Sequence, residues 1–225
     1  DIVVKINPPA NRRADHGSDE PESFHEADHL KPGAIWVSLL HPERNPDAAE
    51  RLRKANATVF ALERVPRISR AQSMDVLSSM AGVAGYRAVI EAAWTYDRFV
   101  GARTTAAGST PPADMLVIGA GVAGLSAIAT GRDLGAQVRA FDVRPAVREE
   151  VESLGGDFLM LDLPLEEAGD GEQAGYATEM GEEFLEAELD LFREEVPDSD
   201  LVITTAAIPG RQAPELVTEP MVERM

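Results

Sequence analysis

The sequence contains no cysteine, which excludes disulfide bonds, thiolate metal sites and cysteine nucleophiles. Lysine is scarce as well and occurs only at Lys5, Lys31 and Lys54. A long hydrophobic segment is also missing, because the longest uncharged run, 115–131, is rich in glycine and shorter than the roughly 20 apolar residues that a membrane-spanning helix needs. We therefore expect no direct membrane insertion of this chain.

Basic residues are few compared with acidic ones. The chain has 21 Lys and Arg against 39 Asp and Glu, which gives a formal net charge of -18. Such a charge repels nucleic acid and anionic lipid, so neither is an expected partner. Two explanations stay open: an acidic surface adapted to high salt, or the arginine-rich codon usage of a G+C-rich genome. The 44% of hydrophobic residues is enough for one large or two modest domains with buried cores.

The two ends of the sequence indicate a fragment. Asp1 leads directly into a strand-like run at 2–6, with neither an initiator methionine nor a signal peptide before it. The last residues, 222–225, have the pattern of a helix interior. We therefore expect a chain truncated at both ends.

Residues 1–66 are predicted to form a partial α/β domain, because strand and helix patterns alternate along them. The expected elements are strands at 2–6, 34–40 and 58–65 and a helix at 46–56 that begins with proline. The polar segment 7–29 is expected to be a loop with at most a short helix. It holds His16, His25 and His29 close to acidic residues, which is compatible with a metal site or with a solvated acidic loop. We favour the loop and assign no metal.

Residues 67–112 differ in character and are predicted to connect two domains. A polar segment at 67–75 precedes a helical stretch that extends to about Val100 and carries small residues suited to close packing. Residues 101–112 are then expected to be a turn-rich linker.

Residues 113–225 alternate again and predict a doubly wound parallel sheet of the Rossmann type. The expected elements are strands at 115–118, 137–141, 158–161 and 201–205 and helices at 122–134, 146–154 and 179–195. The expected fold class is therefore α/β: a Rossmann-type sheet, incomplete at its C-terminal end, plus a partial second α/β domain.

A glycine motif, Gly119-Ala-Gly121-Val122-Ala-Gly124, follows the first strand of this sheet and opens a helix. In a dinucleotide-binding turn, Gly119 would make the tight bend, Gly121 would let the backbone approach a pyrophosphate, and Gly124 would let the helix lie close to the sheet. The diphosphate would rest on the positive end of the helix. Taken alone, these glycines are also compatible with an ordinary glycine-rich turn.

Asp142 provides the second half of the dinucleotide signal. It stands at the end of the next expected strand, where a carboxylate can accept hydrogen bonds from the ribose hydroxyls of adenosine. Arg144 could pair with the 2′-phosphate of NADP, but Asp142 would repel that phosphate at close range. The pattern therefore favours NAD over NADP.

Five segments carry a resemblance to a known family: 67–75 (RISRAQSMD), 84–92 (AGYRAVIEA), 117–125 (VIGAGVAGL), 139–145 (RAFDVRP) and 204–210 (TTAAIPG). In these segments the chain resembles the NAD(H)-binding part of the alpha subunit of proton-translocating NAD(P) transhydrogenases. The resemblance implies hydride transfer between NAD(H) bound here and NADP(H) bound on a separate domain, coupled to proton movement through membrane helices. Because hydride passes directly between two nicotinamide rings, no general acid or base is required.

The resemblance also implies roles for particular residues. The residues expected on the nicotinamide side, as the catalytic set, are Arg67, Gln72, Asp75 and Ser78. The residues expected to bind the cofactor are Gly119, Gly121, Val122, Gly124, Asp142, Arg144, Tyr176 and Ala206, with Tyr176 on a loop that closes over the nucleotide. Considered singly, Asp75 and Ser78 are equally suited to capping a helix.

The implied partners are an NADP-binding domain and a membrane domain (beta subunit), together with a second copy of the NAD-binding component. The implied location is the cytoplasmic face of the inner (plasma) membrane, with this piece itself soluble.

An alternative is an NAD-dependent amino-acid dehydrogenase. His41 follows the second strand where the related alanine dehydrogenases place a catalytic histidine, and Lys5 stands where they keep a substrate-binding lysine. A non-catalytic NAD-binding module is a third possibility.

Overall fold

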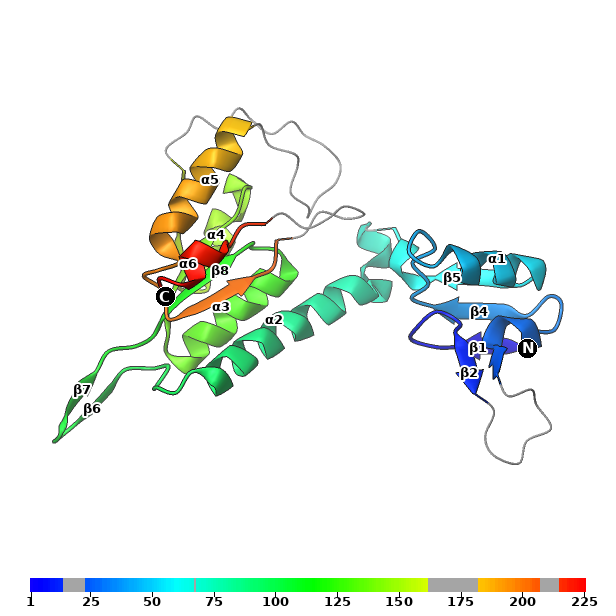
Figure 1. The fold of residues 1–225 in the computed structure, drawn as a ribbon, viewed down its shortest axis with the longest axis horizontal. Helices are drawn as coiled ribbons and strands as arrows, with labels where there is room; N and C mark the ends of the chain where they lie inside the picture. The colour runs from blue at the N-terminus through cyan, green and yellow to red at the C-terminus, as the bar shows by residue number, and fades with distance from the viewer. Residues whose placement is uncertain (14–22, 67, 162–181, 207–214) are drawn as a thin grey trace. The chain divides into compact units, whose positions relative to one another are not determined.

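The structure is a computed structural model, and it describes residues 1–13, 23–66, 68–161, 182–206 and 215–225. These residues divide into two compact units, Asp1–Ser79 and Met80–Met225 (Figure 1). Each unit contains a parallel β-sheet whose strands alternate with helices. The α/β fold class predicted from the sequence is therefore confirmed. No helix in the described part is long and apolar enough to cross a membrane.

The first unit is built on a three-stranded parallel sheet with the order β1-β4-β5. Its elements are β1 (Ile2–Val4), β2 (Asn11–Arg13), β3 (Ser23–His25), η1 (Glu26–His29), β4 (Ile35–Ser38), α1 (Pro46–Lys54), β5 (Thr58–Ala61), η2 (Leu62–Arg64) and η3 (Ser69–Met74). Pro46 at the start of α1 suits the first turn of a helix, because its fixed φ is helical and its missing N–H would have no partner there. Leu52 of α1 and Trp36 of β4 are buried in one apolar cluster and hold the helix on the sheet.

The segment expected as a loop at 7–29 contains more structure than its sequence indicates. β2 and β3 pair antiparallel, with Arg12 opposite Phe24, and η1 follows directly. Strands of three residues are too short to display the alternation from which a strand is recognised. For this reason the sequence pattern missed the pair.

A long helix, α2 (Val76–Thr95), spans the division between the two units. Beyond it, β6 (Arg103–Thr105) and β7 (Gly108–Thr110) form an antiparallel hairpin that extends from the rest of the second unit (Figure 1). The segment 101–112 was expected to be a turn-rich linker, and the structure forms this hairpin within it. Its strands are polar and largely exposed on both faces, so they lack the apolar alternation that marks a strand.

The second unit is built on a four-stranded parallel sheet with the order β10-β9-β8-β11. Its elements are β8 (Asp114–Ile118), α3 (Val122–Leu134), β9 (Gln137–Phe141), η4 (Pro145–Val147), α4 (Arg148–Ser153), β10 (Asp157–Phe158), α5 (Glu182–Glu195), β11 (Leu201–Thr204) and α6 (Glu219–Val222). The chain moves outward from β8 through β9 to β10 and then returns to add β11 on the other side of β8. This reversal is the defining feature of a doubly wound sheet.

Helices cover both faces of this sheet, and the central strand shows why. Successive side chains of a strand point to opposite faces, and β8 is apolar on both. Met115 and Val117 pack in one buried cluster with α2 and α3, whereas Leu116 and Ile118 pack in another with α5. In Figure 1 α5 accordingly lies on the opposite side of the sheet from α2 and α3. The sheet is therefore a buried platform whose strand ends can carry a site.

Candidate dinucleotide-binding site

The candidate site lies at the carboxyl ends of β8 and β11, where the winding of the sheet reverses. In open α/β sheets, ligands bind in the crevice at this point. Thr205, which follows β11, ties the two strand ends together: its N–H donates to the Ile118 carbonyl at 2.8 Å and its hydroxyl to the Gly119 carbonyl at 2.9 Å. Ala206 is the next residue, so the predicted cofactor residues Gly119 and Ala206 are neighbours in space.

The three glycines of the motif meet different surroundings. Gly119 has φ +98, a conformation that side chains disfavour, and a Cβ there would lie 2.8 Å from the Thr205 hydroxyl. A Cβ on Gly124 would lie 1.8 Å from the Gly119 carbonyl oxygen, so only glycine allows α3 to start this close to the strand. A Cβ on Gly121 would meet no atom within 4 Å. Packing thus explains Gly119 and Gly124, whereas the space beside Gly121 fits the approach of a ligand.

The amino end of α3 supplies hydrogen-bond donors at this space. Gly121 is the N-cap and its carbonyl accepts from Leu125 N–H at 2.8 Å, so the N–H groups of the intervening residues, including Val122, have no acceptor within the helix. No acidic residue stands in the first turn. The end of a helix carries about half a positive charge, which favours an anion there.

Asp142 follows β9 and accepts four hydrogen bonds. Two come from the backbone: Ala120 N–H reaches Oδ2 at 2.7 Å and Arg144 N–H reaches Oδ1 at 2.9 Å. Two come from the Arg144 guanidinium, whose Nε reaches Oδ1 at 2.9 Å and whose second nitrogen reaches Oδ2 at 3.0 Å. A carboxylate has about four acceptor positions, so all of them are filled. The backbone bonds fix the carboxylate against the glycine turn, and Arg144 covers its remaining face.

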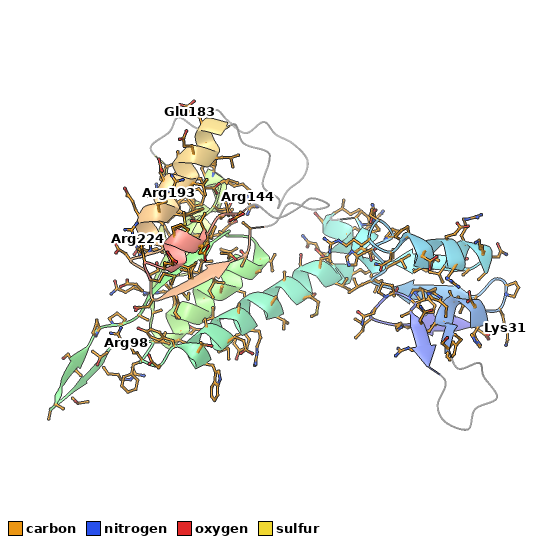
Figure 2. All side chains as sticks on the ribbon, viewed as in Figure 1. Lys31, Arg98, Arg144, Glu183, Arg193 and Arg224 are labelled. Carbon is orange, nitrogen blue, oxygen red and sulfur yellow. The ribbon has the colours of Figure 1, made fainter. Side chains whose placement is uncertain are left out.

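Arg144 is strongly engaged by this contact. Its hydrogen bond to Asp142 raises the pKa of the guanidinium, and the Asp142 side chain is only 7% exposed. Figure 2 shows Arg144 in the second unit, close to the sheet. The two residues predicted to set nucleotide choice are therefore in direct contact.

An apolar pocket that opens to solvent adjoins Asp142. Its walls come from the ends of β9 and β10, from the segments that follow them and from the first turn of α5, and they include Phe141, Pro145, Phe158, Leu159 and Phe184. Walls of this kind are suited to contact with a flat apolar ring.

Glu188 is a candidate residue that sequence reasoning missed. It lies on α5 one turn from Phe184 of the pocket wall and one turn from Phe192, which packs edge to face on Phe141. Glu188 is only 4% exposed. Burial, and secondarily the charge of Asp142, raises the pKa of Glu188 to about 7. The sequence did contain one indication of its burial: Glu188 lies four residues from Phe184 and four from Phe192, on the same face of the helix.

The residues expected on the nicotinamide side lie in the first unit. Asp75 caps α2, because its carboxylate accepts from the Ser78 N–H at 3.0 Å and from the Ser78 hydroxyl at 2.6 Å. Gln72 is exposed in η3, and its carbonyl accepts from the Asp75 N–H at 3.1 Å. The structure thus groups Gln72, Asp75 and Ser78. Arg67 and Tyr176 lie outside the described residues.

The two residues behind the dehydrogenase alternative are both held by glutamates. Lys5 donates to Glu26 and to the Pro8 carbonyl. Burial alone would raise the pKa of Glu26, but hydrogen bonds from Lys5, Arg12 and the Ala10 N–H lower it to about 2. His41 has φ 45, and its N–H donates to Glu63 at 2.7 Å. A positive φ is uncommon in a non-glycine residue.

The histidines considered for a metal site have other contacts. His25 accepts the Ala27 N–H at 3.2 Å, and the His29 ring packs edge to face on Phe24. His16 lies outside the described residues. Within the ranges that the structure describes, no group of three potential metal ligands occurs.

Comparisons with known proteins place both halves of the chain. Residues 1–84 match the family described as alanine dehydrogenase/PNT, N-terminal domain, and residues 88–225 match alanine dehydrogenase/PNT, C-terminal domain. NAD(P) transhydrogenase subunit alpha of Cereibacter sphaeroides is 51% identical over the whole chain, which covers 40% of that relative. Alanine dehydrogenase of Mycolicibacterium smegmatis is 29% identical over 89% of the chain and 48% of the relative.

Among solved structures, a transhydrogenase from Sinorhizobium meliloti matches with a TM-score of 0.78 and 41% identity. The match covers the whole of this chain and 55% of the other. The chain thus spans about half the length of such relatives. On the family matches to both of its halves, this chain belongs to the alanine dehydrogenase/PNT family.

Proposed function

We propose that this chain is the NAD(H)-binding component of a proton-translocating NAD(P) transhydrogenase, which transfers hydride between NAD(H) held here and NADP(H) held on a partner domain. The observation that carries the proposal is Asp142, fixed by two backbone N–H groups at the ribose position of a glycine turn. The 51% identity to a transhydrogenase alpha subunit supports the reaction. In this proposal residues 113–225 are the NAD-binding domain, and residues 67–112 supply its nicotinamide side.

The residues present fit a dinucleotide. The open space at Gly121 and the free N–H groups at Val122 and beyond would receive the diphosphate. The two ribose hydroxyls would take the two acceptor positions on Asp142 that Arg144 fills, while Ala120 and the Arg144 backbone keep their bonds. The adjoining apolar pocket would receive the adenine.

Selectivity for NAD(H) follows from the same carboxylate. The two hydroxyl groups of the ribose would replace the two N–H donors of the Arg144 guanidinium, so all acceptor positions of Asp142 would stay filled. A 2′-phosphate would bring negative charge against Asp142 and would remove one donor. We therefore assign NAD(H) to this chain and NADP(H) to the partner domain.

For hydride transfer, the nicotinamide ring supplies or accepts the hydride when bound, and the chain positions it. We assign Gln72 to hydrogen bonding of the carboxamide group, because its side chain is exposed. Asp75 and Ser78 would contribute through the fixed geometry of their capping bonds. Arg67 and Tyr176 are assigned to the same site from the family resemblance alone.

The proposed partners are an NADP-binding domain and a membrane domain at the cytoplasmic face of the membrane, together with a second copy of this chain. The second copy is supported by apolar side chains that α2 leaves exposed, including Met80, Val83 and Trp94, the last of which is 86% exposed. The projecting β6–β7 hairpin supports it as well, because its strands pair only with each other in the described part of the chain.

An alanine dehydrogenase is the second candidate, and the unusual backbone of His41 at the end of β4 favours it. The ion pair of Lys5 with Glu26 weighs against it, because a lysine with a neighbouring carboxylate is a poorer ligand for a substrate carboxylate.

Equilibrium titration with NADH and NADPH, followed by nucleotide fluorescence, tests the proposal. Saturable binding of NADH at least about ten times tighter than that of NADPH is expected. Equal affinities would contradict it. Oxidation of NADH on addition of pyruvate and ammonia would favour the dehydrogenase instead.

A further inference from the structure

The buried stripe of α5 contains one carboxyl group. Phe184, Glu188 and Phe192 are four residues apart and share a helix face. Phe184 lines the pocket beside Asp142, and Phe192 packs on Phe141, the residue before Asp142, with ring centroids 5.3 Å apart. Glu188 is therefore placed between two side chains that both reach the neighbourhood of Asp142.

Glu188 has little to stabilise its charge there. In the part of the chain that the structure describes, it forms no ion pair and no side-chain hydrogen bond. The strands and the C-terminal segment packed against α5 present apolar residues, including Leu116, Ile118 and Met221. The ionised group that acts on Glu188 is Asp142. Burial and a like charge both favour the protonated form of a carboxyl group.

Arg144 currently balances the charge of Asp142. Its guanidinium forms both side-chain bonds to that carboxylate, and Glu150 of α4 also acts on it. At the far end of α5, Glu195 pairs with Arg139, so that pair is no counterion for Glu188. Loss of the Arg144 contact would leave Asp142 facing Glu188 without its cation.

We propose that Glu188 is the second carboxyl group of the ribose site and takes up a proton from solvent when a nucleotide diol displaces Arg144 from Asp142. This inference rests on the proposed function, because the diol is that of NAD(H). A neutral Glu188 lets Asp142 accept the ribose hydroxyls without a repelling neighbour, and the anionic diphosphate acts in the same direction. Nucleotide binding is thereby linked to pH.

The sign of this linkage is fixed. The pKa of Glu188 is about 7 before binding and rises on binding. Well below pH 7 Glu188 is protonated both in the free chain and in the complex, so nucleotide binding takes up no proton and the affinity does not depend on pH. Above pH 7 the free chain must gain a proton to bind, so NADH affinity should fall by up to about ten-fold per pH unit.

Isothermal titration calorimetry of NADH into this chain, in buffers of low and high ionisation enthalpy, counts the protons. We expect uptake of about half a proton at pH 7 and close to one at pH 8, provided that the pKa in the complex exceeds about 9. Glu188→Gln should remove the uptake and flatten the pH dependence of affinity. Glu186→Gln, at an exposed position of the same helix, should behave like the wild type.

Arg144→Gln provides a test that does not alter Glu188. It removes the cation beforehand, so Glu188 should already be protonated and the uptake at pH 8 should shrink. NADH binding without proton uptake, or uptake unchanged in Glu188→Gln, would overturn this inference and leave the proposed function intact. Absence of NADH binding by the wild type would overturn both.

Discussion

Replacement of Asp142 should separate the two nucleotides. In Asp142→Ala the proposed acceptor of both ribose hydroxyls is lost, together with the bond from the Ala120 N–H to Asp142 in the glycine turn. In Asp142→Asn one oxygen remains to accept from Ala120, whereas the amide nitrogen donates and cannot receive a hydroxyl proton. The pair of variants therefore distinguishes ribose binding from support of the turn.

The magnitude follows from the contacts. A hydrogen bond to a charged group contributes about 1.5 to 3 kcal/mol. Loss of this contribution corresponds to a weakening of NADH binding by about ten- to a hundred-fold. In the free chain the Arg144 guanidinium occupies the same acceptor positions on Asp142, and the ribose must displace it. The net contribution of the ribose hydrogen bonds is therefore reduced, and we expect a loss of NADH affinity closer to ten-fold than to a hundred-fold.

NADPH should respond differently. With Asp142 replaced, the 2′-phosphate no longer meets a carboxylate, and the freed Arg144 guanidinium can pair with it. NADPH affinity should therefore change little or improve in both variants, while NADH affinity falls. Fluorescence titration of both nucleotides on wild type, Asp142→Ala and Asp142→Asn measures this. Parallel losses for the two nucleotides, or no loss for NADH, would show that Asp142 is not the ribose ligand.

The remaining predictions concern the turn, the nicotinamide side, the buried acid and the surface. Gly124→Ala should destabilise the fold by about 1–3 kcal/mol in denaturant unfolding, because its Cβ would overlap the Gly119 carbonyl, whereas Gly121→Ala should keep stability and lose NADH affinity. Gln72→Ala should slow single-turnover hydride transfer while leaving NADH affinity within a few-fold; equal losses would mean uniform binding. Because its raised pKa makes Glu188 costly to ionise, the stability advantage of Glu188→Gln over wild type should grow as pH rises from about 4.5 through about 7, and a pH-independent difference would contradict this. If the acidic surface is a salt adaptation, the unfolding temperature should rise with molar potassium chloride, and a constant value would favour codon usage instead.

The parallel sheets could be predicted from the sequence because their strands are apolar on both faces and lie between helices with clear ends. β8, α3 and β9 were predicted almost to the residue, since the glycine turn fixes the junction of β8 and α3 and Gly135, with φ 92, ends α3. The antiparallel pairs β2–β3 and β6–β7 could not be predicted, because strands of three residues are too short to show an alternation of apolar and polar residues.

The candidate site could be proposed from the sequence where its chemistry is tied to residue spacing. Asp142 and the glycines form a recognisable pattern, and in the structure the Ala120 N–H, which lies between Gly119 and Gly121, donates to Asp142. The bidentate cover of Asp142 by Arg144 was not predictable, because it depends on side-chain direction at the strand end. Glu188 was not predicted for a related reason. An acidic residue in an acidic helix is expected to face solvent, and its burial becomes apparent only when the packing of Phe184 and Phe192 is known.

Hydride transfer itself tests the central claim most directly. This chain, loaded with NADH and mixed with an NADP-binding transhydrogenase domain that carries an NADP⁺ analogue, should reduce that analogue in a single-turnover stopped-flow experiment. The chain without the partner domain should show no steady turnover. Transfer that requires both components is the predicted result. Absence of transfer although both nucleotides are bound, or steady NADH to NADP⁺ analogue turnover by this chain alone, would contradict the assignment.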